Sequence, residues 1–414
     1  MKPKAAMIFS QFPCYDEVFI LREMVELDRR LDLTILSIKR PLRDPIRHAI
    51  GEGLAGRTVY SFLLRDRRVL GENLRLLFSR PGLYLRLIAL VFRLNRTDGE
   101  FLLKSLAALP QAVYFARVCR EREIARVHGQ WATYPALTAM VISRINSIPF
   151  SFTGHAHDIY DKTIGLARKL EEADFVITCT RDNRRYLESL APDLRPGKIR
   201  VIHHGVDLGH YQPKEGSVTG REGGGDGPFR ILSVGSLFEC KGFEYLIAAG
   251  DILRREGIDF RCRIVGGGYL ENRLRRLVAE KGLEEYIDFT GYQPQEGMPG
   301  HYRWADLFIL PAVLEIHWGI PNVLLESLAS GVPVACTPLP ALPELIGDPP
   351  CGFSIPEKDP AAIAGLVGNL SRDRELLDRY GRAGRRKIEE KWDIRKTSAE
   401  IAALFTAPPS RQQE

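Results

Sequence analysis

The sequence contains no uncharged apolar stretch of 18 residues among its 414 residues, so it predicts no membrane-spanning helix. Its beginning also lacks the pattern of a signal peptide, because the apolar run after Lys2 and Lys4 is interrupted by Gln11 and Pro13. Cysteine is scarce, and the seven residues are scattered without a C-x-x-C pair, which argues against a disulfide framework or a zinc site. These absences predict a cytoplasmic protein with reduced thiols.

Basic residues are concentrated in one part of the chain. Residues 61–126 contain 13 Lys and Arg against 6 Asp and Glu, a net charge of +7 compared with +6 for the whole chain. Within this region, residues 65–96 mix arginine with Leu, Phe, Ile and Tyr, a composition that can lie on an anionic membrane. This interpretation predicts peripheral contact with the inner face of the plasma membrane; the alternative is an ordinary pair of basic helices packed on the domain. Nucleic-acid binding is not predicted, because no recognised module is present.

Strand and helix patterns alternate along the chain in two series. The first begins with a strand at 4–12 and ends with a strand at 198–206, and the second begins with a strand at 230–237. Alternation at this spacing predicts βαβ units and parallel sheets, the arrangement of α/β proteins. Residues 213–228 are rich in glycine and polar residues and predict a linker. We therefore expect one domain over 1–210 and another over 228–390.

A strand–loop–helix at 306–337 carries the sharpest local signal. The predicted strand ends at Pro311, Gly319 and Pro321 precede a helix, and Gly331 follows it. Helix starts at the carboxyl ends of parallel strands bind phosphates through their free N–H groups, so the amides of 320–323 are candidates to hold a diphosphate. Glu326 lies one turn into this helix, where a carboxylate can accept from two ribose hydroxyls. The alternative is a plain strand–loop–helix with a surface glutamate.

The segment GIPNVLLESLASGVPV (319–334) resembles the donor-binding segment of family 4 glycosyltransferases, which are retaining enzymes of the GT-B fold. FPCYDEVFILREM, HGQWATYPALTAM and PFSFTGHAHDIY resemble segments of its exopolysaccharide, colanic-acid-type subgroup. VIHHGVD, ILSVGSLFECKGFEYLI, IVGGGYL and FTGYQP follow in the family's order, so the resemblance covers nearly the whole chain. It implies two Rossmann-like domains whose parallel sheets face each other across an interdomain cleft. The first domain would bind the acceptor, the second the nucleotide sugar, and the last helix, within 391–414, would cross back to the first domain.

The resemblance also implies roles for individual residues. His155 matches the histidine that contacts the donor sugar near the reacting centre, and Lys241 matches the lysine that neutralises the diphosphate. Glu326 matches the second glutamate of the Glu-x7-Glu motif, which binds the ribose, and Gly291 lines the base pocket. The phosphate-binding helix start corresponds to Gly319, Ile320, Pro321, Asn322 and Val323.

Two positions depart from the family's pattern. Ser236 stands where the family has an arginine, so one phosphate cation is missing. Trp318 stands where the first glutamate of Glu-x7-Glu is expected, and Glu315 lies three residues earlier. We therefore expect Glu315 to supply the missing carboxylate as a catalytic residue, with Trp318 against the donor sugar. Both departures also fit a protein of low or no activity.

The predicted reaction is retaining transfer of a sugar from a UDP- or GDP-linked donor to a polysaccharide or lipid-linked saccharide, without a metal or other cofactor. Lys241 and the helix amides would stabilise the leaving diphosphate. The alternatives are a non-catalytic, nucleotide-sugar-binding scaffold of a polysaccharide assembly system and a GT-B nucleotide-sugar 2-epimerase. A metal site at His155, His157 and Asp158 is geometrically possible, because alternate residues of a strand face the same side, but it is disfavoured because no remote His/Asp pair of known spacing supports it.

Overall fold

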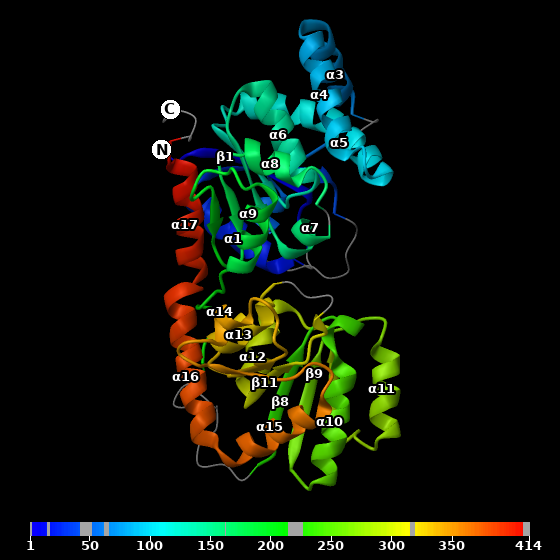
Figure 1. Ribbon diagram of the computed structural model, residues 1–414, viewed down its shortest axis with the longest axis vertical. Coiled ribbons are helices and arrows are strands. Elements are labelled where there is room, and N and C mark those ends of the chain that lie inside the picture. Colours follow the sequence, from blue (N-terminus) through cyan, green and yellow to red (C-terminus); the bar gives the residue numbers. More distant parts are fainter. Residues whose placement is uncertain are drawn as a thin grey trace. The chain divides into compact units, whose positions relative to one another are not determined.

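The computed structural model describes residues 2–14, 17–41, 52–61, 66–161, 163–213, 227–314 and 319–408. The chain divides into two compact units (Figure 1). Unit 1 comprises Met1–His203 and Arg395–Glu414, and unit 2 comprises His204–Ile394. Two predicted site residues, Glu315 and Trp318, and most of the predicted linker lie outside the described residues.

Unit 1 is built on a seven-stranded sheet with the order β3-β2-β1-β4-β5-β6-β7. All neighbouring strands are parallel. The central strands are almost completely buried, as expected for a parallel sheet with helices on both faces. The strands are β1 (Lys4–Gln11), β2 (Asp32–Lys39), β3 (Val59–Tyr60), β4 (Arg126–Gln130), β5 (Phe150–Gly154), β6 (Val176–Thr178) and β7 (Ile199–Val201).

Helices connect the strands of this sheet. Helix α6 (Tyr134–Asn146) approaches β4 so closely that a Cβ at Gly129 would lie 2.5 Å from the backbone nitrogen of Ala136, so only glycine fits at position 129. The connecting helices are α1 (Val18–Asp28), α2 (Glu52–Ala55), α6 (Tyr134–Asn146), α7 (Ala156–Tyr160), α8 (Leu166–Glu172) and α9 (Arg181–Leu190).

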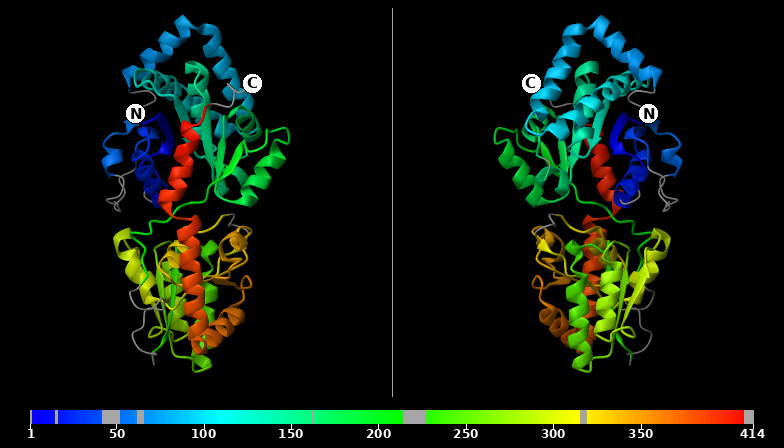
Figure 2. Two further views of the ribbon diagram at one scale, coloured as in Figure 1. Left: turned by 90° about the vertical axis from the view of Figure 1, so that its left-hand side faces the viewer. Right: turned by 90° about the vertical axis from the view of Figure 1, so that its right-hand side faces the viewer.

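Residues 65–96 contain a pair of helices, α3 (Arg67–Ser79) and α4 (Pro81–Asn95), and a third helix, α5 (Gly99–Glu121), follows in the basic region. Pro81 separates the first two, because the residue before a proline is pushed out of helical conformation, and Arg80 has φ −141° and ψ 62°. Helices α3 and α4 extend beyond the sheet of unit 1 (Figures 1 and 2). Within the described part of the chain, no helix combines the length and apolar character needed to cross a membrane.

Unit 2 is built on a six-stranded parallel sheet with the order β10-β9-β8-β11-β12-β13. Its strands are β8 (Phe229–Val234), β9 (Phe260–Val265), β10 (Ile287–Gly291), β11 (Leu307–Leu310), β12 (Val334–Cys336) and β13 (Gly352–Ser354). The helices are α10 (Phe243–Arg255), α11 (Glu271–Glu280), α12 (Met298–Trp304), α13 (Asn322–Ala329), α14 (Leu342–Ile346), α15 (Pro360–Arg372) and α16 (Arg374–Lys391), with 3₁₀ turns at Glu239–Lys241 and Gln295–Gly297.

The charged C-terminal stretch forms two helices, α16 and α17 (Ile394–Thr406). Trp392 and Asp393 separate the two helices. The Val206 N–H donates to the Trp392 carbonyl at 2.8 Å, and Val206 forms a parallel β-bridge with Asp393. Residues Arg395–Glu414 belong to unit 1. Ile401 and Phe405 of α17 are buried in a core cluster that also contains residues of β1, β2 and α1.

Both sheets have the same topology. In each, the first strand lies at the centre, the second and third follow on one side, and the fourth and later strands follow on the other. This is the Rossmann arrangement, and ligands bind at the carboxyl ends of the two strands where the order reverses. The prediction of two Rossmann-like domains with parallel sheets is confirmed. The reversal lies between β1 and β4 in unit 1 and between β8 and β11 in unit 2.

Candidate functional site

The reversal point of unit 2 brings together two loops that the sequence analysis assigned to donor binding. Strand β8 is followed by Gly235 and Ser236, and the neighbouring strand β11 is followed by Pro311. A backbone hydrogen bond of 3.0 Å from the Val313 N–H to the Cys240 carbonyl joins the two loops. The loop that carries Lys241 and the loop that leads to α13 therefore share one edge of the sheet.

Lys241 ends the 3₁₀ turn that follows β8. Its alkyl chain lies over Gly235, because a Cβ at Gly235 would be 3.3 Å from the Lys241 Cδ. Burial lowers the pKa of Lys241 below the ordinary value for lysine, and the nearby thiols of Cys240 and Cys336 partly oppose this shift. A bound anion would favour the charged ammonium, which suits this lysine to neutralising a diphosphate.

Gly242 fixes the position of the Lys241 loop against the strand beside it. Its φ is +65°, and a Cβ here would lie 2.0 Å from the carbonyl oxygen of Pro311. Gly266, at the end of β9, shows the same kind of approach: its φ is +139°, and a Cβ would lie 2.0 Å from the carbonyl oxygen of Gly235. Glycine is required at both positions, because the backbones of three neighbouring loops come into direct contact there.

Helix α13 begins where the sequence analysis placed a phosphate-binding helix start. Pro321 is its N-cap residue, with φ −62°, and no side chain caps this end of the helix. The five residues predicted to bind phosphate, 319–323, are partly exposed. The first amides of α13 can therefore donate to an anion, and the helix dipole adds to that attraction.

Glu326 is not the surface glutamate that the alternative interpretation required. It is 6% exposed, and its Oε2 accepts a hydrogen bond of 2.9 Å from the Tyr302 hydroxyl of α12. A hydrogen bond of this kind fixes the carboxylate in one orientation. Tyr302 was not predicted as a partner of Glu326, because its phenol lies 24 residues away and on a different helix.

The other two predicted donor residues lie along the same edge of the sheet. Gly291 ends β10 with φ +69°, its carbonyl accepts from the Gly266 N–H at 2.9 Å, and a Cβ there would meet nothing within 4 Å. Ser236 is exposed directly after β8 and supplies no charge. Gly291, Ser236 and Lys241 thus lie at the ends of strands or in the loops that follow them, whereas His155 lies in unit 1.

Unit 1 has a cavity of about 620 Å³ at its own reversal point. Ser10 and Gln11 at the end of β1 line it, together with Trp131 directly after β4 and Asp158 of α7. We call this cavity the unit 1 pocket. The surrounding segments were predicted to lie on the acceptor side, but Trp131 was not among the predicted site residues.

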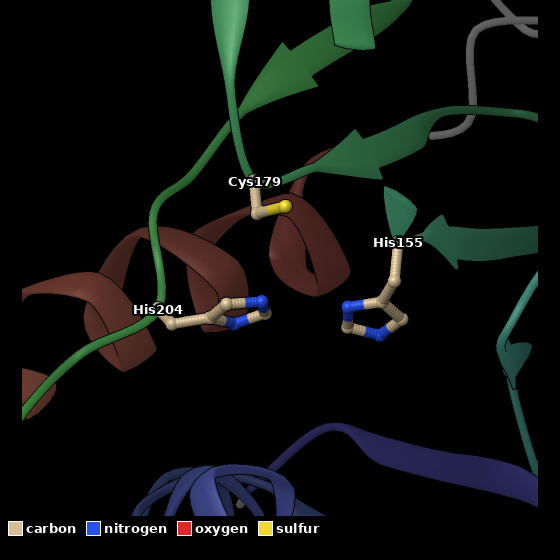
Figure 3. Close-up of side chains that lie close together, drawn as sticks. All are labelled: His155, Cys179 and His204. Carbon is tan, nitrogen blue, oxygen red and sulfur yellow. The ribbon is translucent and has the colours of Figure 1, made fainter. Parts of the chain in front are cut away.

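His155 lies immediately before α7 and is 4% exposed. Its ring packs against Trp131, with ring centroids 4.3 Å apart, and against Phe19 at 5.8 Å. Figure 3 shows His155 and Cys179 side by side; a ring nitrogen of His155 and the Cys179 sulfur lie within 4.8 Å. His204, also labelled there, is the first residue of unit 2.

The strand geometry considered for a metal site at His155, His157 and Asp158 is wrong. Strand β5 ends at Gly154 and helix α7 begins at Ala156, so the alternation of a strand does not apply to these residues. The side chain of His157 is 69% exposed and pairs with Asp161 at 3.6 Å, whereas His155 and Asp158 are buried. The change from strand to helix therefore separates the side chains that the hypothesis would have brought together.

Two family models match successive parts of the chain. The model described as "Glycosyltransferase Family 4" matches residues 50–210, and the model described as "Glycosyl transferases group 1" matches residues 221–387. Two Rossmann-like units with these matches define the class as GT-B glycosyltransferases. The chain belongs to glycosyltransferase family 4, and its relatives include proteins named for exopolysaccharide biosynthesis.

Three relatives illustrate the range of similarity. A glycosyltransferase of Salmonella typhimurium, provisionally named for colanic acid biosynthesis, is 32% identical over 214 residues, 51% of each chain. An amylovoran biosynthesis glycosyltransferase of Erwinia amylovora is 35% identical over 181 residues, 43% of this chain and 44% of the relative. A GDP-mannose-dependent alpha-(1-6)-phosphatidylinositol monomannoside mannosyltransferase of Mycolicibacterium smegmatis is 29% identical over 323 residues, 74% of this chain and 83% of the relative. The chain spans about half the length of the first two relatives.

Solved structures confirm the fold. The Anabaena protein HepE in complex with UDP has a TM-score of 0.71 at 14% identity, covering 98% of this chain and 100% of that chain. Sucrose-phosphate synthase of Thermosynechococcus elongatus has a TM-score of 0.68 at 18% identity, covering 100% of this chain and 99% of that chain.

Proposed function

We propose that the protein is a retaining glycosyltransferase that moves a sugar from a nucleotide diphosphate sugar to a polysaccharide or lipid-linked saccharide. The observation that carries this proposal is the juxtaposition, at the reversal point of unit 2, of Lys241 with the loop that leads to the uncapped start of α13. Unit 2 would hold the donor, with its diphosphate on these groups and its ribose on Glu326. Unit 1 would hold the acceptor.

The proposed step breaks the bond between the sugar's anomeric carbon and the diphosphate oxygen. A bond forms between that carbon and an acceptor hydroxyl oxygen, and the hydroxyl proton passes to the departing diphosphate. Negative charge grows on the diphosphate as the bond breaks, so preformed donors around it lower the barrier. Because the leaving group takes the proton, this route requires accurate positioning more than a strong protein base.

We also propose that the reaction needs no metal ion. The positive charge would come from Lys241 and from the amides and dipole of α13. The position of Ser236 offers no cation, so Lys241 would carry a larger share of the charge than in relatives with arginine there. The proposal leaves both UDP- and GDP-linked sugars as donors: one relative is named for GDP-mannose, and HepE was solved with UDP.

The test begins with donor binding. UDP- and GDP-linked sugars are screened by thermal shift, since a ligand at 100 times its Kd stabilises the folded state by about 2.7 kcal/mol. The donor that binds is then incubated with saccharide and lipid-linked saccharide acceptors, and release of the nucleoside diphosphate is measured. We expect release that depends on the acceptor, survives a chelator within about twofold, and yields a product with the donor's anomeric configuration.

A non-catalytic, nucleotide-sugar-binding scaffold is the second candidate, and Ser236 and Trp318 favour it. A scaffold would bind the donor, so its melting temperature would rise in the thermal-shift screen, but it would release no nucleoside diphosphate with any acceptor. A nucleotide-sugar 2-epimerase would change the donor sugar without an acceptor, which the same incubations reveal. Donor binding without acceptor-dependent release would thus contradict the proposed transferase.

We further propose that unit 1 makes peripheral contact with the cytoplasmic, inner face of the plasma membrane through α3 and α4. Large apolar side chains are exposed there beside arginines, a composition that suits the headgroup region of an anionic membrane. They are Leu70, Leu74, Phe78, Leu85, Ile88 and Phe92. The most exposed are Phe78, at 80%, and Leu70, at 62%.

Replacing Phe78 and Phe92 with serine should reduce binding to anionic vesicles at least tenfold, about 1.4 kcal/mol, since burying one phenylalanine is worth about 1.5–3 kcal/mol. Cosedimentation with phosphatidylserine-containing and neutral vesicles, at low and high salt, is the measurement. Phe238→Ser is the control, because Phe238 is 41% exposed but lies in unit 2. Equal binding by the double variant and the control, or equal binding to both kinds of vesicle, would contradict the membrane proposal.

A further inference from the structure

The unit 1 pocket has the position and size of a ligand site. It opens at the carboxyl ends of β1 and β4, the reversal point of this sheet, and its volume of about 620 Å³ is within the range of roughly 300–1,000 Å³ found for ligand pockets. Its residues come from the ends of strands and from α5, α6 and α7. A ligand in this pocket would therefore be surrounded by backbone that the sheet holds in place.

Trp131 forms an aromatic wall of the pocket. Its φ is +90°, a conformation that bulky residues rarely adopt, so the surrounding structure holds it there. Its backbone N–H donates to the Thr153 carbonyl at 3.1 Å, and its indole N–H donates to Glu17 at 3.3 Å. The C–H face of a sugar ring can stack on an indole held in this way, with the Glu17 carboxylate at its edge.

Asp158 places a buried carboxylate at the same pocket. It is 2% exposed, and one oxygen accepts from the Ala132 N–H. Burial raises the pKa of Asp158 to about 7, against the opposing effect of backbone N–H groups of Ala132, His155 and Asp158 itself. A carboxyl group accepts hydrogen bonds when ionised and also donates one when protonated, so it can bond with a hydroxyl group of a ligand in either state. Lys169 holds the next peptide of the same loop, because its Nζ donates to the Ala132 carbonyl at 2.7 Å.

The charges around the pocket are unbalanced. Among the described residues, four acidic side chains line it, those of Glu17, Asp98, Glu100 and Asp158, and one ammonium, that of Lys104. Asp158, whose pKa burial raises to about 7, is only partly charged at neutral pH. Lys104 is already paired with Glu100. His157, which also lines the pocket, pairs with Asp161. Carboxylates accept hydrogen bonds from hydroxyl and ammonium groups, whereas a carboxylate or phosphate on the ligand would be repelled.

We infer that the unit 1 pocket binds the acceptor's reacting sugar between Trp131 and Asp158, and that its acidic lining selects an uncharged or amino sugar against a uronic acid or a phosphorylated sugar. This inference rests on the proposed function, in which the chain transfers a sugar to an acceptor saccharide. It adds the chemical class of the acceptor's last sugar.

The first test uses acceptor pairs that differ only at C6, a methyl glucoside and the matching methyl glucuronoside, with kcat/KM measured for each. We expect the neutral sugar to be preferred by at least tenfold. Glu100→Gln removes one carboxylate and releases Lys104 from its ion pair, so the preference should shrink at least threefold. The Glu100 side chain is 76% exposed, so the substitution should not prevent folding.

Glu121→Gln is the matched control. Glu121 lies on the same helix and also pairs with a basic residue, Arg117, but it does not line the pocket. Its preference should equal that of the unmodified chain. The inference is overturned if the glucuronoside reacts as well as the glucoside, or if Glu100→Gln and Glu121→Gln have the same preference.

A binding measurement separates this inference from the proposed function. Binding of the same two methyl glycosides is followed by tryptophan fluorescence, with Trp131→Phe to identify the responding side chain. If no acceptor supports nucleoside diphosphate release but the glucoside binds at Trp131 and the glucuronoside does not, the transferase proposal fails and the pocket's selectivity stands. If transfer occurs but Asp158→Asn and Trp131→Phe change neither binding nor KM, the pocket assignment fails and the transferase stands.

Discussion

Lys241→Ala should lower kcat/KM for the nucleotide-sugar donor by a factor of ten to a hundred, about 1.4–2.7 kcal/mol of transition-state stabilisation. Lys241 lies over Gly235 at the reversal point of unit 2. Negative charge on the diphosphate increases as the glycosidic bond breaks, and Ser236 offers no second cation. The loss should therefore appear in kcat as well as in donor binding.

Proton linkage provides a second measurement at Lys241. Burial lowers the pKa of the unliganded lysine, and a bound diphosphate would raise it again. The complex would therefore hold more protons than the free protein, so affinity for the nucleoside diphosphate should fall as pH rises through the lowered pKa. Calorimetric titrations across that range should show the fall in the unmodified chain and a weaker one in Lys241→Met.

Lys281→Ala is the control for this prediction. Lys281 lies in the same unit and pairs with Asp251 at 3.7 Å, on the surface formed by α10 and the end of α11. It should keep kcat/KM within about twofold of the unmodified chain. If Lys241→Ala behaved like Lys281→Ala, the diphosphate would be neutralised elsewhere, and the assignment of the donor loop would be wrong.

Gly242→Ala should lower the free energy of unfolding by about 3 kcal/mol or more. A left-handed conformation costs an alanine about 1–2 kcal/mol, and the added Cβ would lie 2.0 Å from the Pro311 carbonyl oxygen, so the backbone of one loop must move. The movement would displace Lys241, the residue just before it. Urea unfolding measures the stability, and thermal shift with the donor measures the loss of binding.

Gly257→Ala separates the two causes. Gly257 has nearly the same φ, +71°, but a Cβ there meets nothing within 4 Å. This variant should lose only the conformational cost, about 1–2 kcal/mol, and should bind the donor normally. Equal stability of the two variants would mean that the contact between the Lys241 loop and Pro311 is not as close as the structure describes.

Local signals predicted the elements around the donor loops well. Pro321 and Gly331 bracket α13, because proline suits the start of a helix and glycine its end. In the basic region, the apolar and arginine content of residues 65–96 indicated helices, and Pro81 divides this segment into α3 and α4.

Contacts between distant residues explain what the sequence could not predict. Glu326 is buried against Tyr302 of another helix, and no residue near Glu326 in the sequence indicates that partner. Strand β5 ends at Gly154, where a Cβ would lie 2.9 Å from the Ile159 side chain of α7, and the start of α7 at Ala156 separates His155 from His157. The Trp131 conformation likewise depends on Thr153 and Glu17, which belong to other segments.

The placement of α17 has a consequence for biosynthesis. Unit 2 is one continuous stretch of chain, so it can fold while the ribosome is still adding later residues. Unit 1 needs Ile401 and Phe405 beside β1, so nearly four hundred residues separate the first and last parts of its core. During synthesis, the apolar surface that α17 covers stays exposed until residues 394–406 have left the ribosome, and a premature stop directly after unit 2 would leave it exposed.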